Sequence, residues 1–158
     1  MIYYDRFIPE WLKRADRQEE TVDDCDRFIS LWIAFNGWMK SEYGENKNDR
    51  YLIQSVIGNA EIKSVFEELK IKSVSFQKSL QRLNCCRIID MRDEFNKGRY
   101  KEYDGSFDSL MQAIYQIRCN LFHGRKNVDG NKKDFELIQL ALRILKSLFQ
   151  EYLKKHRP

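Results

Sequence analysis

The sequence predicts an all-α fold, a helical bundle of four or five main helices with shorter helices between them. Apolar residues recur at the three- and four-residue spacing of an α-helix along most of the chain. No segment alternates apolar and polar residues in the way that a half-buried strand does. The two prolines, Pro9 and Pro158, lie near the ends and leave the interior of the chain free to form long helices.

Two helices are expected in the first third of the chain. A short helix within residues 1–20 should start near Pro9, because proline is pre-shaped for a first helical position. A longer helix is expected over residues 23–43, where five large apolar side chains share one face. These five are Phe28, Leu31, Trp32, Phe35 and Met39. Ile29 and Ile33 lie off that face, which predicts that the helix is buried on more than one side.

Four shorter helices and a polar loop are expected in the middle of the chain. The helices should span about 49–57, 59–70, 73–83 and 85–95. Residues 96–106 read as the loop, and either Asp104 or Ser106 is a suitable cap for the helix that follows.

Two longer helices complete the predicted bundle. The first should span about 107–123, with its apolar stripe made of Phe107, Leu110, Met111, Ile114, Arg118, Leu121 and Phe122. The last should span about 134–155, with two adjacent apolar rows that cover about half of its circumference. The first row is Phe135, Ile138, Leu142, Leu145, Phe149 and Tyr152, and the second is Leu137, Ala141, Ile144 and Leu148. So wide an apolar arc can serve a core and a partner helix together.

Length and composition indicate one globular domain over residues 1–158, with its core at roughly 23–155. The net charge of +4 permits a nucleic-acid partner without indicating one. The four cysteines form no C-x-x-C pair and only two histidines occur, so we expect free thiols, no metal site and no cofactor. The chain also has no apolar run near 18 residues, so we expect a cytoplasmic protein without a membrane span.

The residues that point to chemistry lie near the end of the helix at 107–123. Arg118 falls on the apolar stripe, between Met111 and Ile114, where a guanidinium needs a carboxylate, backbone carbonyls or an external anion such as phosphate. His123 closes the same helix, and its imidazole titrates near neutrality. An arginine for a phosphate and a histidine for a proton are the minimal parts for RNA cleavage, in which the 2′-hydroxyl attacks the adjacent phosphate. Asn120 could orient a water, the phosphate or the histidine.

The stretch Arg118-Cys-Asn-Leu-Phe-His123-Gly124 resembles the R-x4–6-H signature of the HEPN superfamily, the higher eukaryote and prokaryote nucleotide-binding domains. The stretch Phe28-Ile-Ser-Leu-Trp-Ile-Ala-Phe-Asn-Gly-Trp38 is similar to the first long helix of many members. The resemblance covers roughly residues 23–155, and its most specific part is about ten residues long.

The resemblance implies a metal-independent endoribonuclease of single-stranded RNA, as found in toxin–antitoxin, CRISPR and anti-phage systems. It implies a homodimer with its site at the interface, and a possible antitoxin-like protein partner. Arg118 and His123 would be catalytic and assisted by Asn120, while Arg125 and Lys126 would bind the substrate. Some toxin members carry a tyrosine two residues after the histidine, where this chain has Arg125, so a mechanism that uses that tyrosine does not transfer.

The dimer answers a geometric objection to this site. On one helix, Arg118 and His123 would point about 140° apart and be separated by a rise of roughly 7.5 Å. They would not converge on one phosphate, whereas two such helices packed across a two-fold axis could bring both pairs into one cleft.

Two other interpretations stay open at the level of the sequence. The chain could be a non-catalytic HEPN module that binds RNA, a nucleotide or a protein partner. It could also be a helical structural protein in which Arg118 pairs with an acid such as Asp90 or Asp93. Cys119 and His156 are weaker candidates for chemistry, as an isolated thiol and a residue of the basic tail.

Overall fold

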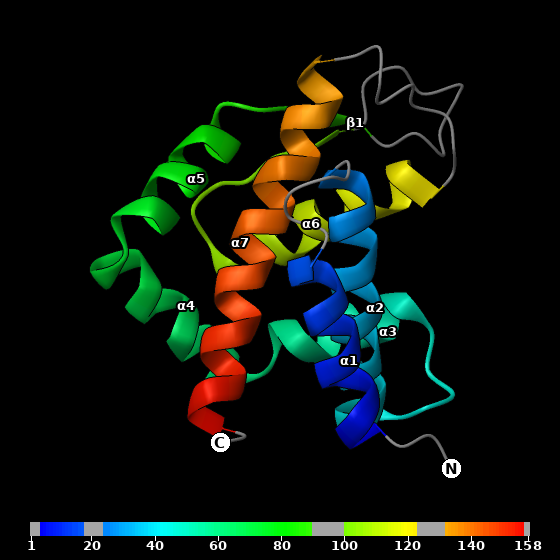
Figure 1. Cartoon of the computed structure of the whole chain (residues 1–158). Coiled ribbons are helices and arrows are strands. Elements are labelled where there is room, and N and C mark those ends of the chain that lie inside the picture. Colours follow the sequence, from blue (N-terminus) through cyan, green and yellow to red (C-terminus); the bar gives the residue numbers. More distant parts are fainter. Residues whose placement is uncertain (1–3, 18–23, 90–99, 123–131, 157–158) are drawn as a thin grey trace. The chain divides into compact units, whose positions relative to one another are not determined.

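Seven α-helices and one two-stranded antiparallel ladder make up the described part of the chain (Figure 1). A computed structural model describes residues 4–17, 24–89, 100–122 and 132–156. The elements are α1 (Tyr4–Arg17), α2 (Asp24–Tyr43), α3 (Asp49–Ile57), α4 (Ala60–Lys72), α5 (Val74–Asn84), β1 (Ile88–Ile89), β2 (Tyr100–Lys101), α6 (Phe107–Phe122) and α7 (Lys132–His156). The predicted all-α fold is confirmed.

The chain divides into two compact units, residues 1–59 and 60–158, and each is described by itself. The expectation of one domain over residues 1–158 stays a prediction.

The first unit is built on α2, which contacts both α1 and α3. The five predicted face residues of α2 are buried, and so are small residues on other sides of the helix, such as Ser30, Ala34 and Gly37. Ile29 and Ile33 are only half-buried, so the less covered side of α2 is the side on which they lie. Gly44 ends the helix with φ +132°, a left-handed conformation that suits glycine.

The expected start of the first helix was wrong. The helix begins by Tyr4, and Pro9 lies inside it instead of at its first position. A proline within a helix lacks the N–H that would bond to the preceding turn, so this site costs α1 one backbone hydrogen bond. The packing of α1 against α2 stabilises a helix that its own sequence would have started later.

The second unit is organised around α7, which contacts α4, α5 and α6. Three aromatic rings join the shorter helices to the core: the Phe66 ring centroid lies 6.2 Å from that of Phe76 and 5.4 Å from that of Phe107. Ser73 separates α4 from α5 and caps α5, because its hydroxyl oxygen accepts a hydrogen bond from the Phe76 N–H at 3.2 Å.

The helix expected over residues 85–95 was also wrong where the structure describes it. The helix α5 ends at Asn84, and the Cys86 N–H donates to the Leu83 carbonyl in a closing turn. Ile88 and Ile89 then pair with Lys101 and Tyr100 as a strand. Two adjacent β-branched residues favour this extended conformation over a helix. Part of the predicted loop at 96–106 is the partner strand β2.

Both apolar rows of α7 are covered within the chain itself. Every member of the two rows is buried except Phe135, which is half-buried. The wide apolar arc therefore serves the core and leaves no exposed apolar row on α7 for a partner helix. None of the described helices is both long and apolar enough to span a membrane.

Candidate functional site

The apolar stripe of α6 runs from the core to the surface along the helix. Phe107, Leu110, Met111 and Ile114 are buried, and Arg118 and Leu121 are half-buried. The next residue, Phe122, is 47% exposed. The predicted stripe is therefore confirmed, and its C-terminal end is the part that reaches solvent.

Arg118 lies on this stripe one turn before the exposed phenylalanine. Its guanidinium carbon stands 4.6 Å from the centroid of the Phe122 ring, within the range of a cation–π contact. The same guanidinium approaches the Cys119 sulfur at 4.0 Å. The aromatic face therefore holds a cationic group at the boundary between core and solvent.

Asn120 faces the interior of the fold. Only 3% of it is exposed, and its Oδ1 accepts a hydrogen bond from the Gln116 Nε2 at 2.9 Å. Residues two positions apart on a helix point about 160° away from each other, so Asn120 and Arg118 do not share a face of α6. An assisting role for Asn120 stays a prediction, and in one chain it does not act on an anion held by Arg118.

Gln116 was not identified from the sequence, although it is as buried as Asn120, at 2% exposed. The two amides are four residues apart, a spacing that places them on one face of a helix. That spacing was the available signal, and it predicts an amide–amide hydrogen bond once α6 is recognised.

The other predicted site residues, His123, Arg125 and Lys126, lie outside the described residues. So do Asp90 and Asp93, the acids considered as partners of Arg118. The structure therefore places two of the five predicted site residues, Arg118 and Asn120, and sets them on different sides of α6.

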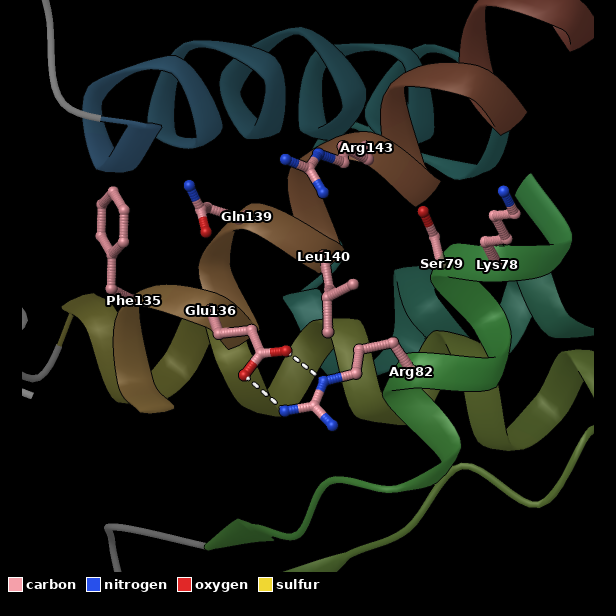
Figure 2. A pocket seen from close by; sticks show the side chains of 8 residues that line it. All are labelled: Lys78, Ser79, Arg82, Phe135, Glu136, Gln139, Leu140 and Arg143. Carbon is pink, nitrogen blue, oxygen red and sulfur yellow. Dashed lines mark hydrogen bonds and ion pairs between the residues drawn. The ribbon is translucent and has the colours of Figure 1, made fainter. Parts of the chain in front are cut away.

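A second feature of the surface is a groove between α5 and α7, which we call the α5–α7 groove. Its volume is about 480 Å³, and it is lined by Lys78, Ser79, Arg82, Phe135, Glu136, Gln139, Leu140 and Arg143. Figure 2 shows Arg82 reaching from α5 to Glu136 on α7. No local pattern in the sequence predicts this groove, because its two walls are far apart along the chain.

The Arg82–Glu136 pair is bidentate. The Arg82 Nη2 donates to the Glu136 Oε2 at 3.0 Å, and the Arg82 Nε donates to the other carboxylate oxygen. This hydrogen bonding lowers the pKa of Glu136 and raises the pKa of Arg82. Both groups stay charged near neutral pH, and the pair neutralises one positive charge of the groove.

A second concave region lies between α4 and the end of α7, and its positive and negative charges are already paired. Lys155 pairs with Glu68 and lies 3.9 Å from Glu151. The His156 Nδ1 lies 3.7 Å from Glu61. The region of about 410 Å³ is lined by Ala60, Glu61, Ser64, Val65, Glu68, Lys155 and His156. It offers no excess of positive charge to an anion.

All four cysteines are free thiols, as expected. Cys25 and Cys119 are buried, whereas Cys85 is exposed and Cys86 is half-buried at the end of α5. Burial raises the pKa of the Cys86 thiol, which makes it a weaker nucleophile near neutral pH. Among the described residues, no three histidine, cysteine or acidic side chains are grouped to hold a metal ion.

Comparison with known proteins places the chain in no group. No protein-family model matches it, and neither the curated proteins nor the solved structures contain a significant match.

Proposed function

We propose that the chain is a HEPN-like, metal-independent endoribonuclease that cleaves single-stranded RNA at a site shared by two copies. The observation that carries the proposal is the position of Arg118. It is a guanidinium on the apolar stripe of α6, held over Phe122 where the stripe meets solvent, and it lies five residues before His123. A toxin-like or anti-phage setting and an antitoxin-like partner remain expectations from the resemblance.

The proposed reaction needs one cation and one proton carrier. The 2′-oxygen of a nucleotide forms a bond to the adjacent phosphorus, and the bond from phosphorus to the 5′-oxygen of the next nucleotide breaks. Either His123 takes the 2′-hydroxyl proton and water protonates the leaving 5′-oxygen, or water takes the first proton and His123 supplies the second. Arg118 stabilises the negative charge that develops on the phosphate oxygens, because its planar guanidinium can hold two of them. The products are a 2′,3′-cyclic phosphate and a 5′-hydroxyl.

Two copies give this site the geometry that one helix lacks. Arg118 of one copy and His123 of the other can converge where the corresponding residues of one helix diverge. The solvent-reaching end of α6, with Phe122 47% exposed, offers a surface for this meeting.

The test is cleavage of a mixed-sequence RNA in the presence of EDTA. Wild type should cleave, and Arg118→Ala should lose about 100-fold or more of the rate, because one oxyanion-stabilising group is removed. His123→Ala should lose a similar factor through general acid–base catalysis.

The chain offers a matched control for each variant. His156 is the other histidine of the sequence, and Arg87 is an exposed arginine whose Nε lies 3.8 Å from Glu102. His156→Ala and Arg87→Ala should both cleave as wild type does. Undiminished cleavage by Arg118→Ala and His123→Ala would reject the site. RNA binding by wild type without any cleavage would favour the non-catalytic binding module instead.

A further inference from the structure

Positive charge gathers on α5 and on the first part of α7. The helix α5 carries Lys78 and Arg82 and no acidic residue. Together, α5 and residues 132–150 hold six basic and two acidic residues, an excess of four. Both segments are therefore net positive.

The α5–α7 groove lies between these segments, and two of its cations have no acidic partner. Lys78 and Arg143 are exposed on opposite walls, and neither forms an ion pair within the described parts of the chain. Glu136 is the one acid in the lining, and Arg82 already neutralises it. The groove therefore presents two unmatched positive charges to solvent, unlike the charge-matched region between α4 and α7.

The remaining lining residues suit a nucleic acid strand. Ser79 and Gln139 carry neutral hydrogen-bonding groups on the two walls, and Phe135 is a half-buried aromatic ring at one end (Figure 2). From Phe135 to Arg143, α7 rises about 12 Å, longer than one nucleotide step. Cations that contact phosphates and a ring on which a base can stack are the elements of sequence-tolerant single-strand binding.

We propose that the α5–α7 groove binds the backbone of a single-stranded RNA, with Lys78 and Arg143 contacting phosphates and Phe135 stacking on a base. This inference rests on the proposed function, because it assigns the binding of the same substrate to a surface separate from Arg118. The groove holds the strand, and the reaction takes place elsewhere.

The test measures the binding of a labelled 15-nucleotide single-stranded RNA in the His123→Ala background, which spares the RNA from cleavage. Lys78→Gln/Arg143→Gln should bind about tenfold more weakly at 50 mM salt, because two phosphate contacts are lost. The slope of log affinity against log salt should become shallower by about 1.4, or 0.7 for each lost contact.

The matched control removes two charges elsewhere on the same unit. Lys63 and Lys154 are exposed on α4 and α7 outside the groove, and neither forms an ion pair within the described residues. Lys63→Gln/Lys154→Gln should change the affinity by less than about twofold, because only the long-range charge falls. Equal losses in the two double variants, or no loss in the groove variant, would overturn the proposal.

A variant that is expected to bind RNA more tightly provides a second test, because misfolding would weaken binding and not strengthen it. Glu136→Gln removes the one acidic charge of the lining and releases Arg82 from its ion pair. RNA affinity should rise about threefold. Unchanged or weaker binding by this variant would count against the groove.

The two proposals fail in different ways. If Arg118→Ala abolishes cleavage while the groove variant binds and cleaves like wild type, the groove assignment is wrong and the nuclease site stands. If the groove variant loses binding while Arg118→Ala and His123→Ala still cleave, the nuclease site is wrong and the groove stands. No RNA binding by wild type overturns both.

Discussion

Asn120 and Gln116 form a buried pair of side-chain amides near the end of α6. Removing either amide should lower the stability of the fold. Each side chain is 3% exposed or less, and the Gln116 Nε2 donates to the Asn120 Oδ1 at 2.9 Å. A buried amide that loses a partner keeps its desolvation cost without the compensating hydrogen bond. Any loss of activity on substitution of Asn120 must therefore be separated from a loss of folded protein.

Asn120→Ala should lower the free energy of unfolding by about 1–3 kcal/mol, because the Gln116 amide loses an acceptor. Urea denaturation followed by circular dichroism measures this change. Gln112→Ala is the control, since Gln112 is a half-buried amide of the same helix and should cost less than about 0.5 kcal/mol. A double variant, Gln116→Ala/Asn120→Ala, should cost less than the two single changes added together. Strict additivity would show that the two amides are not coupled.

At the scale of single residues, the sequence predicts where a side chain lies on its helix better than it predicts which side chains it contacts. Helical periodicity placed Arg118 on the apolar stripe of α6, and the structure confirms it there. Periodicity did not reveal that Phe122 lies under the guanidinium or that Asn120 faces inward to Gln116. Those contacts depend on side-chain rotamers and on which part of the stripe the rest of the chain covers.

The start of α6 depends on a capping network around one exposed carboxylate. The Ser106 hydroxyl oxygen accepts a hydrogen bond from the Ser109 N–H at 3.1 Å, so Ser106 caps the helix as the sequence allowed. Asp104 accepts hydrogen bonds from the Ser109 and Ser106 hydroxyls, both at 2.7 Å. These hydrogen bonds lower the pKa of Asp104 from 3.8 to about 2, and the bond from the Ser109 hydroxyl has the largest effect.

Asp104→Asn should lower the thermal midpoint at pH 7, because the charged acceptor of this network is lost. A carboxyl group with a lowered pKa stabilises the fold above its unfolded pKa of 3.8, and that contribution disappears as the pH falls through about 2. The difference in thermal midpoint between Asp104→Asn and wild type should therefore disappear between pH 4 and pH 2. Asp108→Asn, in the first turn of the same helix, should show a smaller difference at pH 7. A difference for Asp104→Asn that is constant with pH would contradict this assignment.

Helix boundaries followed the sequence wherever local signals were strong. The ends of α2, α3 and α5 lie within about one residue of their predicted positions. In the structure, Gly44 follows α2, and the side chains of Asn48 and Ser73 cap α3 and α5. The two errors fell where packing decides against local preference. Pro9 lies inside α1, which packs against α2. Residues 88–89 pair with β2, a partner that periodicity cannot reveal.

At the scale of the whole chain, the all-α class was predictable and the distribution of charge in space was not. Composition gave a net charge of +4 but no location for it. The location emerges when α5 and α7 lie side by side in the second unit and bring Arg82 and Glu136 together across 54 residues of sequence. Both apolar rows of α7 are buried apart from the half-buried Phe135, so the proposed dimer would form through another surface.

The central claim is that Arg118 and His123 of two different copies act on one RNA phosphate. The most direct measurement is RNA cleavage in EDTA by a mixed dimer of Arg118→Ala and His123→Ala chains, isolated through two different affinity tags after co-expression. The mixed dimer keeps one Arg118 and one His123 on different copies, so the account predicts cleavage well above that of either variant alone. A mixed dimer as inactive as both parent variants, or the absence of any dimer to isolate, would contradict it.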